Sequence, residues 1–202
     1  DRSGKMSKSS GEFLRLQLLI DKGYHPFAYR LMCLQAHYRS ELEFSWDGLG
    51  AALTRLKRLV MAAATARDAE PAEPTDRRLV DLLAKFDAAM SDDLNTPVAL
   101  TLLEETAAMK KIDAGQKHAA LAAMDAVLGL TLLTTARADL RVRPKTAMIG
   151  EDEIEATLAR RKDARAAKDF AASDALRDEL VAAGVEVMDG DPLGWDWQPS
   201  AN

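Results

Sequence analysis

Apolar side chains recur every three or four positions through the first two thirds of the chain, which is the spacing of one face of an α-helix. The longest such stretch begins after Ser45, whose side chain is suited to capping a helix, and continues to about Arg67. Its apolar side is expected to comprise Leu49, Leu53, Leu56, Val60 and Ala64. Shorter stretches with the same spacing predict further helices at 14–20, 27–38, 76–86, 96–107 and 114–130.

The pattern changes after residue 130. Residues 131–150 lose the helical period and contain Pro144 and Gly150, which predicts a loop. Two helices of a hairpin are then expected at 151–169 and 171–183. The alternation in 185–188 predicts a short strand, with Trp195 and Trp197 on one face of the strand that returns beside it.

Composition favours a mostly α-helical fold. Of the 202 residues, 48% are hydrophobic but only 5% are aromatic, and alanine runs are frequent, which suits helices that pack closely through small side chains. No apolar run approaches the roughly 18 residues that a membrane span needs. The lone cysteine, Cys33, and the absence of a visible secretory signal predict a cytoplasmic protein. The start at Asp1, within a polar segment, suggests the back part of a longer protein.

Charge is distributed unevenly along the chain. The formal net charge is −5, which by itself argues against a nucleic-acid partner. Residues 1–67, however, carry 11 Lys and Arg against 6 Asp and Glu, whereas residues 68–202 carry 16 against 26. The first third is therefore basic, and its cations either form solvated helix faces or contact a polyanion.

One short motif carries chemistry. Residues 5–9 spell KMSKS between Gly4 and Gly11, which leave the backbone free to move. The motif resembles the signature loop that closes on ATP in class I aminoacyl-tRNA synthetases. Lysine ammonium groups there stabilise the negative charge that grows on the pyrophosphate leaving group. By this resemblance Lys8 contacts ATP and Lys5 assists in catalysis. The hydroxyl groups of Ser7 and Ser9 either donate to phosphate or cap the loop.

The segments that follow the motif resemble the cysteinyl-tRNA synthetase family. They are Gly11-Glu12-Phe13, Gly23-Tyr24-His25-Pro26, Ala36-His37-Tyr38-Arg39-Ser40, Met90-Ser91-Asp92-Asp93-Leu94-Asn95-Thr96-Pro97 and Lys168-Asp169-Phe170. The resemblance extends over nearly the whole chain and implies five parts: a KMSKS loop (1–12), stem-contact helices (13–67), a helical bundle (68–130), a linker (131–150) and a small anticodon-side domain (151–202). The fold it implies ends in a helical hairpin with a short β-hairpin.

The resemblance also implies partners. The intact protein is expected to be a cytoplasmic, monomeric ligase that activates cysteine with ATP and transfers it to tRNA(Cys). The nucleotide-binding catalytic domain of the family precedes the KMSKS loop, and its zinc site is expected only there. Within this chain, the single Cys33 and the three histidines lack the spacing of a zinc site, so no metal ligand is assigned. This chain alone is expected to be inactive.

Four residues are candidates for tRNA contact. His37 and Arg39 are placed to touch the acceptor stem, although His37 as a packed helix residue is an equal alternative. Arg165 and Trp197 are candidates on the anticodon side; the alternatives are a helix face crossed by salt bridges and a small hydrophobic core. Asp92 and Asp93 are interpreted as helix-capping residues rather than as a carboxylate pair for metal or acid–base chemistry. Cys33 is expected to be a buried structural thiol.

Two other functions remain open at this stage. One is a related ligase that uses the cysteine adenylate to acylate an amino sugar, for which an RNA-binding C-terminal end would have no purpose. The other is a noncatalytic helical interaction module that retains the loop. Binding to a protein partner without preference for tRNA would favour the module.

Overall fold

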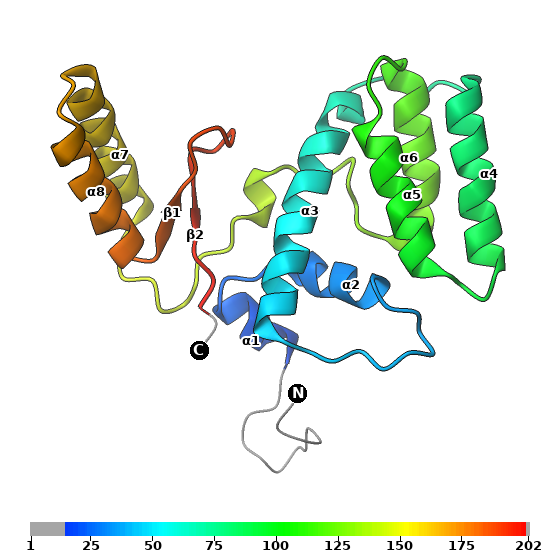
Figure 1. Ribbon diagram of the computed structural model, residues 1–202, viewed down its shortest axis with the longest axis horizontal. Helices are drawn as coiled ribbons and strands as arrows, with labels where there is room; N and C mark the ends of the chain where they lie inside the picture. The colour runs from blue at the N-terminus through cyan, green and yellow to red at the C-terminus, as the bar shows by residue number, and fades with distance from the viewer. Residues whose placement is uncertain (1–14, 201–202) are drawn as a thin grey trace, which may run out of the picture. The chain divides into compact units, whose positions relative to one another are not determined.

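The computed structural model describes residues 15–200, and the described part is mostly α-helical as predicted. In chain order the elements are α1 (Leu16–Asp21), α2 (Pro26–Leu34), α3 (Trp46–Arg67), α4 (Arg77–Ser91), α5 (Thr96–Ala108), α6 (Ala114–Leu128), a 3₁₀ turn (Ala138–Leu140), α7 (Glu151–Ala166), α8 (Phe170–Ala182), β1 (Val185–Val187) and β2 (Trp195–Trp197) (Figure 1). The described residues form two compact units, 25–140 and 15–24 together with 141–200.

The first unit is a bundle whose helices begin where the sequence supplies side-chain acceptors. Ser45 accepts a hydrogen bond from the Gly48 amide at the start of α3, as predicted. Asp76 accepts in the same way from Arg78 at the start of α4. Each cap satisfies a backbone N–H that has no partner within its own helix, so these helix starts were predictable from local sequence.

The long helix α3 lies at the centre of this unit and packs against α2, α5 and α6. Leu49, Leu56 and Val60 are completely buried, in agreement with the predicted apolar side. One position of that prediction is wrong: Ala64 is exposed, and the neighbouring Ala63 is buried instead. The 3.6-residue period moves the buried side by one position after four turns.

The helix α2 is shorter than predicted. It ends at Leu34 rather than at Tyr38, and its buried residues are Ala28, Leu31 and Met32. Cys33 lies on the opposite side and is exposed, so the prediction of a buried thiol is wrong. Consecutive residues of a helix point about 100° apart, and apolar neighbours therefore do not ensure burial.

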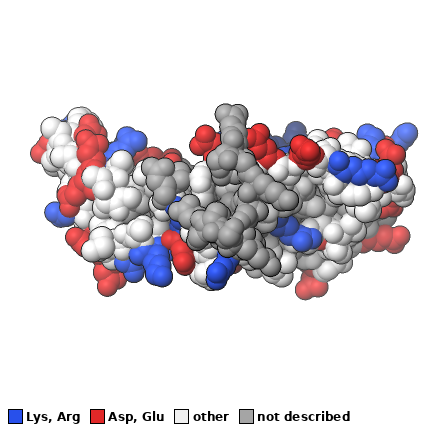
Figure 2. All heavy atoms as spheres, turned by 90° about the horizontal axis from the view of Figure 1, so that it is seen from below, with Lys and Arg blue, Asp and Glu red and all other residues white. Residues whose placement is uncertain are grey.

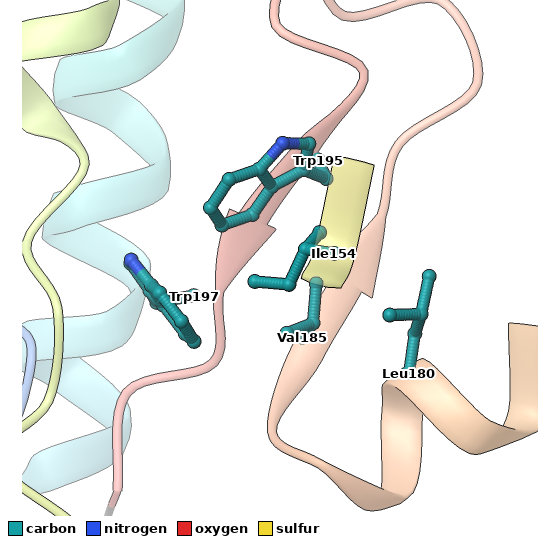
Figure 3. Packing of buried hydrophobic residues seen from close by; sticks show 5 residues of the cluster. All are labelled: Ile154, Leu180, Val185, Trp195 and Trp197. Carbon is teal, nitrogen blue, oxygen red and sulfur yellow. The ribbon is translucent and has the colours of Figure 1, made fainter. Parts of the chain in front are cut away.

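The second unit closes around two tryptophans. The helices α7 and α8 pack as a hairpin, and β1 pairs antiparallel with β2 so that Val185 faces Trp197 and Val187 faces Trp195. Figure 3 shows the core that these elements enclose. Its buried members are Ile154, Leu180, Val185, Trp195 and Trp197.

The helix α1 belongs to the second unit although more than a hundred residues separate it from the rest. The amide of Lys145 donates to the Asp21 carbonyl oxygen at 2.7 Å, and the amide of Ser200 donates to that of Lys22 at 3.0 Å. Gly23 follows these two residues directly and has a φ of +91°. A Cβ atom at this position would lie 2.8 Å from Pro144 Cγ. Glycine is required at this position because L side chains rarely adopt that φ and because Pro144 fills the space.

The segment 131–150 contains no α-helix or strand, as predicted, but it is anchored. The buried carboxylate of Asp125 accepts hydrogen bonds from the amides of Leu130 at 2.7 Å and Leu132 at 2.6 Å. Leu132 and Leu140 are buried in the first unit. Buried backbone amides need partners, and Asp125 provides them where helix hydrogen bonding has ended.

Candidate nucleic-acid interface

The KMSKS residues Lys5, Ser7, Lys8 and Ser9 lie outside the described residues. Their assignment to ATP therefore stays a prediction. The other candidates, His37, Arg39, Arg165 and Trp197, are all described and fall into two groups, one in each unit.

In the first unit, the turn after α2 is held by Asp93. The Tyr38 hydroxyl donates to Asp93 Oδ1 at 2.6 Å, and Arg39 Nε lies 3.0 Å from Asp93 Oδ2. His37 Nε2 lies 2.9 Å from the Asp93 carbonyl oxygen, and its ring stacks on Tyr38 with centroids 4.8 Å apart. His37 is therefore a turn residue, and the alternative of a packed helix histidine is wrong.

This contact also corrects the interpretation of Asp92 and Asp93. The side chain that accepts from the first turn of α5 is Asn95, through the Val98 amide. Asp92 ends α4, and Asp93 has a left-handed backbone with a φ of 54°. This backbone turns the Asp93 side chain toward the α2 turn instead of along α5. The Arg39 side chain stays 68% exposed, so it can still meet an anion from solvent.

In the second unit, two arginines of α7 converge on one carboxylate. Arg161 donates to both oxygens of Asp189 at 3.1 Å, and Arg165 Nη1 lies 3.5 Å from Asp189 Oδ2. Hydrogen bonding from Arg161 lowers the pKa of Asp189, and the positive charges of Arg161, Arg165 and Arg177 add to the effect. Arg161 is nearly buried, whereas the side chains of Arg165 and Asp189 are more than half exposed. Arg161 therefore orients the Asp189 carboxylate, and Arg165 stays accessible from solvent.

An exposed aromatic ring lies at the tip of the same hairpin. Phe170 begins α8 and is 62% exposed. Before it, Lys168 has a φ of 60° and Asp169 caps α8 by accepting from the Ala172 amide at 3.0 Å. In the sequence, Phe170 is noted only as part of the family pattern, and its exposure was not predicted. The spacing of the residues around it does not distinguish an exposed ring from a buried one.

The tryptophans of β2 have a structural role in this conformation. Trp195 and Trp197 are 1% and 2% exposed and lie edge to face with centroids 5.2 Å apart. Trp195 Nε1 donates to Glu155, and the Arg141 guanidinium lies 3.7 Å from the Trp195 ring centroid. The core interpretation is thus confirmed, and the Trp197 ring as placed here is not available for stacking on a base.

The charged surface is mixed. Figure 2 shows one face of the molecule, on which basic and acidic side chains are interspersed. Within residues 15–200, no group of three or more His, Cys, Asp and Glu side chains is arranged to hold a metal ion. Nor does the described chain contain a helix long and apolar enough to cross a membrane. On the face shown in Figure 2, an RNA contact would rely on local groups of residues rather than on a broad basic field.

The α7–α8 hairpin and the strand β1 lie within a segment that matches a known domain family. Residues 151–192 match the family described as the cysteinyl-tRNA ligase anticodon binding domain.

The whole chain matches cysteine–tRNA ligases. It is 68% identical over 98% of its length to that of Novosphingobium aromaticivorans and 46% identical over all of its length to that of Zymomonas mobilis. It is also 41% identical over 92% of its length to one from Burkholderia lata. The alignments cover 41%, 46% and 36% of these relatives, so the chain spans less than half their length. The chain is thus similar to the C-terminal part of cysteinyl-tRNA synthetases, which confirms the resemblance found in its sequence.

Proposed function

We propose that the chain is the tRNA-binding and ATP-loop portion of a cytoplasmic, monomeric enzyme that activates cysteine with ATP and transfers it to tRNA(Cys). The observation that carries this proposal is the match of 151–192 to an anticodon-binding domain. It favours a tRNA ligase over an amino-sugar ligase or an interaction module, because neither alternative needs to bind an anticodon.

The anticodon arm would meet the hairpin of the second unit. Anticodon bases are unpaired and expose both a flat face and a hydrogen-bonding edge. Phe170 offers an exposed ring for stacking, and Asp189 and Arg165 offer an acceptor and donors side by side. Arg161 fixes the Asp189 carboxylate, so that little side-chain entropy is lost when a base binds. In the first unit, Arg39 and His37 would contact phosphates of the acceptor stem.

Catalysis would depend on the part of the enzyme that precedes this chain. There a bound ATP and a zinc-held cysteine would supply the reacting groups. From this chain, Lys8 and Lys5 would stabilise the charge that develops on the leaving pyrophosphate. Without a site to hold ATP and cysteine these lysines have nothing to act on, and the chain alone would be inactive.

The test of tRNA binding compares two RNAs. The full chain is titrated with tRNA(Cys) and with the same tRNA carrying a different anticodon, across a salt series. We expect salt-sensitive binding that weakens when the anticodon is changed, because salt reports phosphate contacts and the substitution reports base recognition. Equal affinity for both RNAs, or no binding, would contradict the assignment of 151–192.

The loop assignment is tested in the intact enzyme. Lys8→Ala is expected to lower the rate of cysteinyl-adenylate formation by about 10²–10³-fold, because one electrostatic contact to the transition state is lost. The affinity for tRNA should stay unchanged. Lys85→Ala, at an exposed position of α4, is the control and should alter neither quantity. A parallel loss of adenylate formation and tRNA affinity would refute the assigned role of Lys8.

A further inference from the structure

The first unit buries a lysine side chain that has no acidic partner. Lys117, on α6, is 4% exposed. Its Nζ donates to the Thr65 hydroxyl at 3.2 Å and to the carbonyl oxygens of Met109 at 3.3 Å and Ala62 at 3.4 Å. All three acceptors are neutral, and all three distances exceed the usual value of about 2.9 Å. No carboxylate among residues 15–200 pairs with this ammonium group.

This arrangement leaves the positive charge poorly compensated. Taking a lysine ammonium out of water is costly unless an anion or short hydrogen bonds replace the lost hydration. Burial accordingly lowers the pKa of Lys117. A carboxylate that reached Nζ would supply the missing negative charge by displacing one of the three neutral acceptors, because an ammonium group has only three N–H donors.

A pocket of 550 Å³ lies against this group. It is bounded by the C-terminal part of α3, the end of α5 and the start of α6, and Figure 1 shows the α5–α6 connection at the same end of the bundle as the end of α3. Its apolar lining consists of Ala62, Ala107, Ala108, Met109, Ile112 and Ala114. Lys110 and Lys111 also line it and are exposed, so they place two more positive charges beside its apolar wall.

We infer that this pocket binds a small amphiphilic monocarboxylate, whose carboxylate meets Lys117 and whose short hydrocarbon chain lies against Met109 and Ile112. The volume is within the range of about 300–1,000 Å³ that small-molecule sites occupy. Alanine, methionine and isoleucine walls suit an apolar chain and disfavour a strongly hydrated dianion such as phosphate. Lys110 and Lys111 would attract the carboxylate on its approach. This site is independent of tRNA binding.

The first test uses octanoate as the probe and the full chain as the protein. Octanoate is titrated while the methyl NMR signals of the protein are followed, and octanamide and inorganic phosphate are the comparison ligands. We expect saturable shifts of the Met109 and Ile112 methyl signals with octanoate, about tenfold weaker binding of uncharged octanamide, and no saturable shift with phosphate. No saturable shift with octanoate, or equal affinities for octanoate and octanamide, would overturn the proposal.

Variants then test the assigned contacts. Lys117→Met keeps the length of the side chain but removes its charge, and we expect about a tenfold loss of octanoate affinity. The double variant Lys110→Gln/Lys111→Gln changes only exposed side chains and should weaken octanoate binding severalfold at low salt. Lys85→Gln, an exposed lysine of α4 that does not line the pocket, should bind octanoate like the parent chain. Should Lys117→Met fail to fold, unchanged affinity in the double variant would still refute the proposal.

Discussion

Phe170 exposes a large aromatic ring at the tip of the α7–α8 hairpin, where it makes no contribution to the core of its unit. Replacing it with alanine should therefore leave folding intact. We predict that Phe170→Ala weakens binding of tRNA(Cys) by about 1–3 kcal/mol, the usual contribution of one stacked base. The measurement is a titration of the full chain at fixed salt.

The matched control for this variant is Val181→Ala, which shortens another exposed side chain of α8. It should leave tRNA affinity unchanged. If both variants lose affinity equally, the effect comes from the helix as a whole and not from stacking by Phe170. Circular dichroism and melting temperature should be unaltered in both proteins.

The buried ammonium group of Lys117 makes stability depend on pH. Burial lowers its pKa in the folded chain from the ordinary value of 10.5. Between these two pKa values the unfolded chain binds more protons than the folded chain, so stability rises as the pH rises. We predict that the free energy of unfolding of the parent chain, relative to Lys117→Met, is greater at pH 10 than at pH 7.

Urea unfolding at both pH values measures this difference. The carbonyl groups that lose a donor in Lys117→Met lose it at both pH values, so this loss cancels in the comparison. Lys85→Met, at an exposed position, should show no such change relative to the parent chain. A difference between the parent chain and Lys117→Met that is independent of pH would contradict the effect of burial on Lys117.

At the level of elements, the start of α3 depends on one side chain. Ser45 is the N-cap of this 22-residue helix. We predict that Ser45→Ala lowers the free energy of unfolding by about 1 kcal/mol, because the Gly48 amide loses its acceptor. Chemical denaturation provides the measurement. Thr101→Ala serves as the control: Thr101 is exposed and bonds to a carbonyl of its own helix, so its replacement should change stability by less than about 0.5 kcal/mol.

The elements that the sequence predicted well are those whose signals are local. Ser45 and Asp76 lie at the starts of the helices that they cap, and Gly23 lies just after the end of α1. The end of α2 was missed for the opposite reason. His37, Tyr38 and Arg39 are held by Asp93, which is more than fifty residues away, and no periodicity records such a contact.

The candidate site was predictable only in part. The family pattern predicted the similarity to cysteinyl-tRNA synthetases that the comparisons show, whereas the assignment of the KMSKS motif to ATP stays a prediction. Neither the motif nor the family pattern shows that the Phe170 ring is exposed whereas the Trp197 ring is buried. That distinction depends on which side of each element faces the core of the second unit, and it required the packing of α7, α8 and β2. The pairing of Arg161 with Asp189 is equally non-local.

At the level of the whole molecule, Gly23 supports a unit built from two distant segments. We predict that Gly23→Ala lowers the stability of the second unit by about 1–3 kcal/mol, because it forces a strained φ and a contact with Pro144. Thermal unfolding followed by tryptophan fluorescence in a Trp46→Phe background is the measurement, because Trp195 and Trp197 lie in that unit whereas Trp46 lies in the first.

Gly150→Ala is the matched control for Gly23→Ala. Gly150 has a φ of −91°, and a Cβ atom there would meet nothing within 4 Å. Its replacement should leave the melting curve unchanged or raise the midpoint slightly. Equal destabilisation by both variants would show that neither the positive φ of Gly23 nor its close approach to Pro144 is responsible, and would contradict the assigned role of Gly23.

The division of the second unit between residues 15–24 and 141–200 has a consequence for synthesis on the ribosome. Chains are made at about 5–20 residues per second and domains tend to fold as they emerge. The helix α1 leaves the ribosome before residues 25–140, and the segments of its own unit leave after them. Residues 25–140 can fold during that interval, and Leu19 of α1, which is buried in the folded chain, stays uncovered until residues 141–200 have emerged. A nascent chain stalled before residue 141 should therefore recruit chaperones through α1, and one released after residue 200 should not.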